Sequence, residues 1–179
     1  MSSFINILTL SRILLAPVIF ILIAIFEFFW LALVLFFIAS ITDYLDGLLA
    51  RKYNLQSKFG EVIDPIADKI LVIFLFVALS VHLSSFYIGF AASIIISREI
   101  WVGALRNLNS ESGNSDATKV LFISKLKTSI QLSCITLYLL GLSLNNMLIL
   151  VISDFLILIS VLITIYTGYL YTVSTFKKQ

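Results

Sequence analysis

Two pairs of aspartates in this sequence have the spacing of residues that share one face of a helix. Asp43 and Asp46 are three residues apart, and Asp64 and Asp68 are four apart, so each pair would present its carboxylates together. Oxygen ligands without histidine or cysteine suit hard cations such as Mg²⁺ or Mn²⁺. The four carboxylates therefore predict a site for two such ions, which could clamp a group that undergoes displacement at phosphorus.

Small residues accompany the aspartates at the same helical spacing. Gly47 and Ala50 lie four and seven residues after Asp43. Gly60 lies four residues before Asp64. Positions without bulky side chains allow a large ligand to approach the backbone closely. We therefore expect the two helix ends that carry the aspartates to face one cavity, open to the cytosol, that admits a bulky ligand.

Interfacial salt bridges are the alternative explanation of the aspartates. Four basic residues lie near them in the sequence and could pair with them: Arg51, Lys52, Lys58 and Lys69. An aspartate at the centre of a bilayer costs about 2.5–3.5 kcal/mol, and less toward the interface. We expect some pairing, but four carboxylates at matched spacing, with small residues between them, fit a ligand site better.

The composition is that of an integral membrane protein. Of the 179 residues, 60% are hydrophobic and only 12% are charged, and the mean hydropathy is +1.09. A soluble globular domain has about one quarter charged residues. The net charge of +2 is too small to indicate a nucleic-acid partner. The single cysteine, Cys134, excludes an intrachain disulfide and is expected to serve packing.

Long apolar runs separated by short polar stretches predict an all-α integral membrane protein in one domain. We expect a short interfacial helix at 2–12, which could continue into the first span, and six transmembrane helices. The expected spans are 13–26, 31–50, 64–83, 86–106, 120–142 and 147–171. Between them, Glu27 should form a tight turn and His82 should be a solvated turn residue.

Basic residues fall on one side of this six-span arrangement. They lie in or beside the 51–60 connection, the 107–119 loop and the C-terminal tail: Arg51, Lys52, Lys58, Arg106, Lys119, Lys125, Lys127, Lys177 and Lys178. The opposite turns, at 27–30, 82–86 and 142–147, contain no lysine or arginine. The positive-inside rule therefore predicts that both termini and the aspartates face the cytosol, from a cytoplasmic (inner) membrane.

The aspartates and the residues around them resemble a known family signature. The pattern Asp43-x2-Asp46-Gly47-x2-Ala50-Arg51-x8-Gly60-x3-Asp64-x3-Asp68 is similar to the complete signature of the CDP-alcohol phosphotransferases. The six-span layout is similar too, so the likeness covers essentially the whole chain. It implies the fold of that family over residues 1–179, a homodimer, and transfer of a substituted phosphate from a CDP-linked donor to an alcohol, with release of CMP.

The resemblance also implies a role for each position of the signature. Asp43, Asp46 and Asp64 would hold two Mg²⁺ or Mn²⁺ ions. Asp68 would be the general base on the acceptor hydroxyl and could also contact a metal ion. Room for the donor, and contacts with its nucleotide, would come from Gly47, Ala50, Arg51, Gly60, Asn6 and Thr9.

Basic residues at the ends of two later spans indicate the acceptor. The segments 97–106 and 124–128 resemble those of bacterial phosphatidylglycerophosphate synthases, as does Asn6-x2-Thr9-x2-Arg12. That likeness implies CDP-diacylglycerol as the donor and glycerol 3-phosphate, a dianion that needs cations, as the acceptor. We expect acceptor-phosphate contacts from four residues: Arg98, Arg106, Lys125 and Lys127. Glu99 could pair with Arg98, and snorkelling at the membrane surface is the alternative explanation of the cations.

Three other functions are compatible with parts of the sequence. Within the family, the acceptor could instead be inositol phosphate, phosphatidylglycerol or an amino alcohol. A cation transporter would distribute carboxylates across the depth of the membrane, whereas this cluster lies only at the cytosolic ends of the spans. A scaffold without chemistry would leave the desolvated acids unexplained.

Overall fold

The computed structural model describes residues 2–52, 58–111 and 122–177, and their side chains except at 2–8, 43–52, 58–62, 65 and 122–125. In this part of the chain every regular element is a helix, which confirms the all-α prediction. The six helices are α1 (Ser2–Ala24), α2 (Phe29–Lys52), α3 (Lys58–His82), α4 (Phe86–Glu111), α5 (Phe122–Ser143) and α6 (Met147–Phe176).

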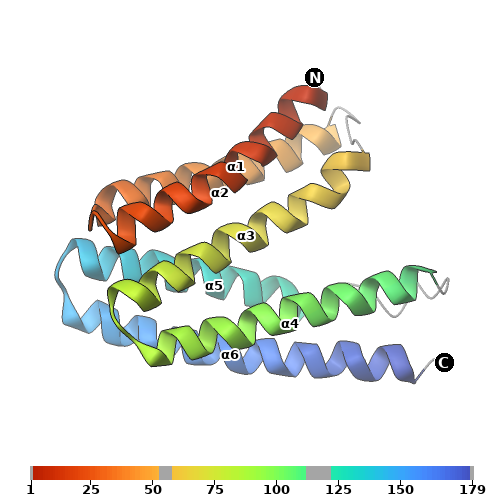
Figure 1. Cartoon of the computed structure of the whole chain (residues 1–179). Helices are drawn as coiled ribbons and strands as arrows, with labels where there is room; N and C mark the ends of the chain where they lie inside the picture. The colour runs from red at the N-terminus through yellow and green to blue at the C-terminus, as the bar shows by residue number, and fades with distance from the viewer. Residues whose placement is uncertain (1, 53–57, 112–121, 178–179) are drawn as a thin grey trace.

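The helices run up and down, so that both termini lie at the same end of the molecule (Figure 1). At the opposite end, tight turns join α1 to α2, α3 to α4 and α5 to α6. Each turn has one residue with positive φ: Glu27 at 57°, Ser84 at 48° and Asn145 at 47°. The predicted turn at Glu27 is thereby confirmed. Asn146 then caps α6, because its side chain accepts hydrogen bonds from the backbone N–H groups of Leu148 and Ile149.

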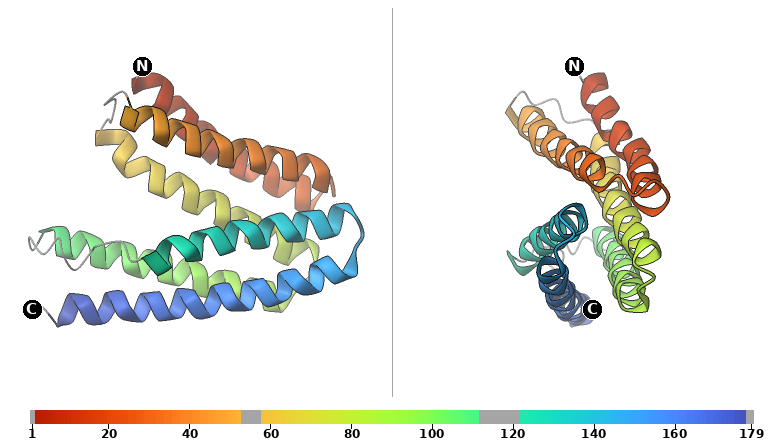
Figure 2. Two further views of the ribbon diagram at one scale, coloured as in Figure 1. Left: turned by 180° about the vertical axis from the view of Figure 1, so that it is seen from behind. Right: turned by 90° about the vertical axis from the view of Figure 1, so that its left-hand side faces the viewer.

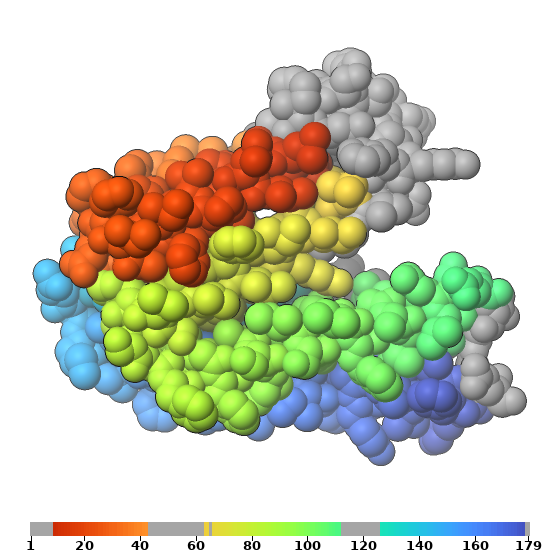
Figure 3. Space-filling view, in the orientation of Figure 1, coloured from red at the N-terminus to blue at the C-terminus, as the bar shows by residue number. Residues whose placement is uncertain are grey.

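The bundle has two parts, α1–α3 and α4–α6, that meet through α2, α3, α4 and α5. Helix α1 packs against α2 and α3, and α6 packs against α4 and α5 (Figure 2). The parts are joined where α3 contacts α4 and where α2 contacts α5. One apolar core runs through them and includes Phe36, Phe76 and Leu139. The two parts separate toward the end that holds the termini (Figure 3). That separation leaves room there for a site.

The surface of the bundle is apolar, and part of its interior is polar. Large hydrophobic side chains such as Phe86, Met147 and Tyr169 are exposed on the outside. Inside, α6 presents a row of small polar residues to its neighbours: Ser153, Ser160, Thr164 and Thr167 are all fully buried. Small and hydroxyl-bearing side chains allow helices to approach closely in lipid and to bond across the contact. This distribution suits a protein whose solvent is a bilayer.

Two of the six helices are long and apolar enough to cross a membrane. Among the described residues these are α4, with 26 residues and mean hydropathy 1.5, and α6, with 30 residues and mean hydropathy 2.9. Helices α1 and α2 contain shorter apolar stretches, at Thr9–Ala24 and Phe29–Thr42. The apolar helices support a membrane protein, and the count of six spans stays a prediction.

Several element boundaries differ from the expected ones, and one decides between two expected arrangements. The segment 2–12 continues into the first span as one helix, α1, with Pro17 inside it, which was one of the two expected arrangements. Helix α3 begins at Lys58, so Gly60 is helical. Helix α4 continues five residues beyond Arg106, because Asn109 ties it to α6: its Nδ2 donates to Leu105 O and to Thr175 Oγ1, both at 2.9 Å. Residues 112–119 of the expected loop lie outside the described residues.

Helix α3 ends at His82, whose environment is not the solvated one expected. Its ring packs against Phe29 with 4.8 Å between ring centroids, and its Nδ1 lies 3.8 Å from Glu27 Oε1. The side chain is only 16% exposed. The imidazole therefore packs between the end of α3 and the turn from α1 to α2. Cys134 is buried and its Sγ lies 3.5 Å from Ser153 O, as expected of a packing residue.

Candidate active site

Two of the four predicted metal-binding aspartates lie on the face of α3 that packs against α1. Thr9 Oγ1 donates a hydrogen bond of 2.6 Å to Asp64 Oδ1. Arg12 Nη1 donates one of 2.6 Å to Asp68 Oδ1, and Arg12 Nη2 lies 3.9 Å from Asp64 Oδ1. We call these four residues (Thr9, Arg12, Asp64 and Asp68) the acidic cluster. The Arg12 side chain is fully buried, so one guanidinium is enclosed between α1 and two carboxylates.

The acidic cluster fits hard metal ions by its chemistry. Its carboxylates stay accessible, because the side chain of Asp64 is 38% exposed and that of Asp68 is 46% exposed. Both offer oxygen, the donor that Mg²⁺ and Mn²⁺ prefer. No group of three or more candidate metal ligands occurs where side chains are described. Asp43 and Asp46 lie in the last turns of α2, at the same end of the bundle (Figure 2), and their side chains are not among those described.

Other predicted donor-binding positions also lie where side chains are not described. These are Asn6 in α1, Gly47, Ala50 and Arg51 in α2, and Gly60 in α3. Thr9 is described, and it orients Asp64. Lys69, one of the cations of the salt-bridge alternative, has its Nζ 3.6 Å from Glu99 Oε2. Among the described side chains, Arg12 from α1 contacts both Asp64 and Asp68.

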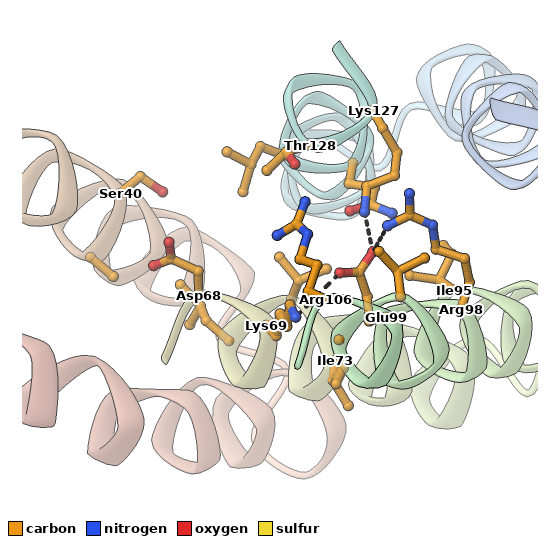
Figure 4. Close-up of a pocket in the computed structure, with 17 residues that line it drawn as sticks. Ser40, Asp68, Lys69, Ile73, Ile95, Arg98, Glu99, Arg106, Lys127 and Thr128 are labelled. Carbon is orange, nitrogen blue, oxygen red and sulfur yellow. Dashed lines mark hydrogen bonds and ion pairs between the residues drawn. The ribbon is translucent and has the colours of Figure 1, made fainter. Parts of the chain in front are cut away.

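A cavity of about 330 Å³ joins Asp68 to the predicted acceptor residues (Figure 4). It lies between α2, α3, α4 and α5. Among the described side chains, its charged lining consists of Asp68, Lys69, Arg98, Glu99, Arg106 and Lys127. Four cations against two carboxylates give this lining a formal net charge of +2. The excess of cations among these side chains favours an anion beside the predicted base.

Glu99 is the centre of the cationic side of the cavity. Arg98 Nη1 donates to Glu99 Oε1 at 3.1 Å, which confirms the predicted pair, and Lys127 Nζ donates to the same oxygen. Lys69 approaches the other oxygen. We call Lys69, Arg98, Arg106 and Lys127, with Glu99, the basic cluster. Because the Glu99 side chain is 14% exposed, its single carboxylate is shared by three cations away from bulk water.

Helix α6 supports the two arginines of the basic cluster from behind. Arg98 Nη2 donates to Thr167 Oγ1 at 2.9 Å, and Arg106 Nη2 donates to Tyr171 Oη at 3.3 Å. Both guanidinium groups also lie over the Tyr171 ring, at 5.6 Å and 5.3 Å from its centroid. Gly168 lets the arginine stem pass, because a Cβ there would lie 3.1 Å from Arg98 Cγ.

Three buried donors in the cavity have no hydrogen-bond partner among the described residues. They are the Nε atoms of Arg98 and Arg106 and the Nε2 atom of Gln131. A buried donor without a partner costs about 1–3 kcal/mol. Three such donors in one cavity are what an anionic ligand with several oxygens would satisfy. Snorkelling does not explain Arg98 and Lys127, since both side chains are more than 90% buried.

The structure brings together most of the predicted acceptor residues and adds others. Arg98, Arg106 and Lys127 line the cavity with Asp68, whereas the side chain of Lys125 is not described. Sequence reasoning missed the roles of three residues: Arg12, Lys69 and Gln131. Two of them had a local signal, because Arg12 lies three residues after Thr9 and Gln131 lies four residues after Lys127. Lys69 had none, since its partner is on another helix.

An apolar hollow adjoins the charged cavity. It lies between α2 and α5, holds about 460 Å³, and is lined by Phe36, Phe37, Ser40, Leu132, Ser133, Thr136 and Leu137. Ser40 and Leu132 line both spaces. A charged cavity next to an apolar hollow suits a molecule with a polar head and hydrocarbon chains.

Comparison with known proteins places the chain in a family. The sequence model of the CDP-alcohol phosphatidyltransferases matches residues 4–166. The chain is 38% identical over 130 residues to the CDP-diacylglycerol–glycerol-3-phosphate 3-phosphatidyltransferase of Salmonella typhimurium. It is 37% identical over the same length to the enzyme of that name from Escherichia coli K12. Each alignment covers 71% of this chain and 71% of the relative. The chain thus belongs to the CDP-alcohol phosphatidyltransferase family.

Proposed function

We propose that this protein transfers the phosphatidyl group of CDP-diacylglycerol to glycerol 3-phosphate, giving phosphatidylglycerophosphate and CMP. The observation that carries the proposal is the shared cavity, in which Asp68 faces the same space as Arg98, Arg106 and Lys127. Relatives at 37–38% identity are named for this reaction. The net charge of +2 in the cavity lining matches the dianionic phosphate of the acceptor.

The basic cluster would hold the acceptor by its phosphate. Arg98 and Arg106 each have a buried Nε that no described residue satisfies, and guanidinium groups suit phosphate because they offer several donors in one plane. Lys127 would add a point charge, and Lys125 a second one. Glu99 and Tyr171 keep these groups in place before the acceptor arrives, so less ordering is needed on binding.

Asp68 would act as the general base. It lines the cavity, and Arg12 fixes one of its oxygens at 2.6 Å, so the carboxylate is oriented toward a hydroxyl held there. The acceptor hydroxyl gives its proton to Asp68, and its oxygen forms the new bond to the phosphorus that carries diacylglycerol. The bond from that phosphorus to the CMP oxygen breaks, and CMP leaves with the electron pair.

Divalent metal ions and the donor nucleotide would bind on the acidic side. We propose that Asp43, Asp46 and Asp64, with Asp68, hold two Mg²⁺ or Mn²⁺ ions, whose charge would stabilise the pyrophosphate and the departing CMP. Thr9 and Arg12 orient two of these carboxylates. Donor contacts are proposed for six residues: Gly47, Ala50, Arg51, Gly60, Asn6 and Thr9.

The setting of this reaction would be the cytoplasmic membrane of a bacterium. We propose a single domain over residues 1–179 with six spans, both termini and the cavity facing the cytosol, and a homodimer. The helix ends beside the termini carry the basic residues, and the outer surface is apolar. The apolar hollow beside Ser40 and Leu132 would receive an acyl chain of the donor.

A reconstituted assay tests the proposed function. The purified chain in lipid micelles is given CDP-diacylglycerol, Mg²⁺ or Mn²⁺, and glycerol 3-phosphate, inositol phosphate, phosphatidylglycerol or an amino alcohol, and CMP release is followed. We expect release with glycerol 3-phosphate, its loss on adding a chelator, and its return with excess metal. Release with inositol phosphate alone would replace the proposed acceptor, and no release with any acceptor would overturn the enzyme assignment.

A further inference from the structure

Gln131 is a buried amide in the cavity for which the reaction described above has no use. It lies on α5 one helical turn beyond Lys127, and its side chain lines the same cavity. The residue is only 4% exposed. Its Nε2 has no hydrogen-bond partner among the described residues. The amide therefore stands in the wall of the site with an unused donor.

Burial makes this donor costly to leave unpaired. Apolar side chains form part of the cavity wall, and they include Leu132, which follows Gln131 in the sequence, with Ile95 of α4 and Val72 of α3. None of these can accept a hydrogen bond. A buried amide without a partner in such surroundings costs free energy, so a glutamine is a poor choice for packing alone. A ligand oxygen is the natural partner.

The chemistry of the amide distinguishes its ligand group from the phosphate. Phosphate charge is already matched by the guanidinium groups of Arg98 and Arg106 and by Lys127. A carboxamide is uncharged and both donates and accepts, which suits a hydroxyl group. Glycerol 3-phosphate has three polar groups: its phosphate, the hydroxyl that reacts, and one secondary hydroxyl. The basic cluster takes the first and Asp68 the second, which leaves the third.

We propose that Gln131 determines acceptor specificity by hydrogen bonding to the secondary hydroxyl of glycerol 3-phosphate. This inference rests on the proposed function. Binding of that hydroxyl orients the carbon chain between the phosphate and the reacting oxygen. A site built to bond a hydroxyl rejects the analogue that lacks it, because the buried amide is then left unpaired. Gln131 thus selects a polyol phosphate over a simple hydroxyalkyl phosphate.

The test compares two acceptors on two forms of the enzyme. The acceptors are glycerol 3-phosphate and 3-hydroxypropyl phosphate, which lacks only the secondary hydroxyl. We expect kcat/KM of the wild type to be about tenfold higher for glycerol 3-phosphate, the size of one buried hydrogen bond. In Gln131→Met, which keeps the volume without the polar atoms, we expect kcat/KM to be equal for the two acceptors, with the KM for CDP-diacylglycerol unchanged.

Two further variants keep the result interpretable. Gln131→Glu keeps an oxygen that can accept from the hydroxyl, so it should retain the preference while raising KM for both phosphates by charge repulsion. Ser143→Ala is the matched control, because it also removes an unpartnered buried polar atom from α5, at the far end of the helix from the cavity. Its kinetics should match those of the wild type.

The outcomes separate this inference from the proposed function. If the wild type releases CMP with glycerol 3-phosphate but does not distinguish the two acceptors, the role of Gln131 is overturned while the proposed function holds. A Gln131→Met enzyme that loses the same factor on both acceptors and keeps the wild-type ratio overturns it too, as does a Gln131→Glu enzyme that no longer prefers glycerol 3-phosphate. No CMP release by the wild type with either acceptor overturns the proposed function, and the inference with it.

Discussion

The acidic and basic clusters are built with opposite ratios of charge. In the acidic cluster one buried guanidinium, Arg12, contacts two carboxylates. In the basic cluster one carboxylate, Glu99, contacts three cations, and Arg106 lies beside them. In each cluster a single charged group, the minority charge, contacts several groups of the opposite sign. Each cluster therefore keeps an excess of that opposite sign. The excess on one side is suited to metal ions, and the excess on the other to a phosphate.

Removing the predicted base from the acidic cluster should have the largest effect. Asp68→Asn keeps the size and the contact with Arg12 but cannot take a proton, so kcat should fall about 10³-fold, within the range of general-base catalysis. Donor binding should be retained, as measured by the KM for CDP-diacylglycerol. Asp154→Asn is the control, because it removes a carboxylate on α6 that bonds Tyr138 remote from the cavity. An Asp68→Asn enzyme with near wild-type kcat would mean that the base is another group.

Neutralising Glu99, the single carboxylate of the basic cluster, should lower the stability of the protein and make its melting temperature depend on bound glycerol 3-phosphate. Glu99→Gln leaves two buried cations, Arg98 and Lys127, and the partly exposed Lys69 without their shared carboxylate, which should lower the free energy of unfolding by about 3 kcal/mol. Glycerol 3-phosphate should then raise the melting temperature more in the variant than in the wild type, because the ligand supplies the missing charge.

Glu111→Gln provides the matched comparison for that measurement. It removes a carboxylate from the exposed last residue of the same helix, α4, and should leave both the melting temperature and the ligand shift unchanged. If Glu99→Gln behaves like Glu111→Gln, Glu99 does not hold the cations together. The two clusters would then differ in the charges that they contain, but the basic cluster would not depend on its single carboxylate for stability.

Deleting one cation of the basic cluster should affect the acceptor and spare the donor. Arg106→Ala removes a guanidinium in the cavity, so the KM for glycerol 3-phosphate should rise roughly 30-fold, the worth of a charge-assisted hydrogen bond. The KM for CDP-diacylglycerol should change little. Arg106→Lys, which keeps the charge but loses the planar donors, should lie between the wild type and the alanine variant. Equal rises in both KM values would argue against a role in acceptor binding.

The smallest effect is expected from a change that moves a cation without removing it. In Gly168→Ala the new Cβ would lie 3.1 Å from Arg98 Cγ, so the arginine must shift by a few tenths of an ångström. The KM for glycerol 3-phosphate should rise about threefold, less than the loss of one full hydrogen bond. Gly89→Ala is the control, because its Cβ would lie 2.7 Å from Ser80 Oγ near the opposite turns. It should lower the melting temperature without changing the KM.

Sequence reasoning predicted best what depends on neighbours along one helix. Sequence spacing predicted that Asp64 and Asp68 lie one turn apart on a helix and that Arg98 pairs with Glu99. The structure has both aspartates in α3 and the Arg98–Glu99 hydrogen bond. The partners of Arg12 and Lys69 could not be predicted in this way, because they lie on other helices, 56 residues away for Arg12 and Asp68. The same holds for the end of α4, which Asn109 extends through a contact with α6. That the Nε2 donor of Gln131 lacks a partner among the described residues is visible only once the cavity is formed.

The two residues shared by the cavity and the apolar hollow, Ser40 and Leu132, have a kinetic consequence. A site that opens to both spaces receives the acceptor from the aqueous solution and the donor from the plane of the membrane. The water-soluble acceptor arrives at a rate set by its molar concentration. The lipid donor arrives by lateral diffusion, at a rate set by its mole fraction in the bilayer. Diluting the donor with inert lipid should therefore slow turnover even when the total amounts of enzyme and donor stay the same.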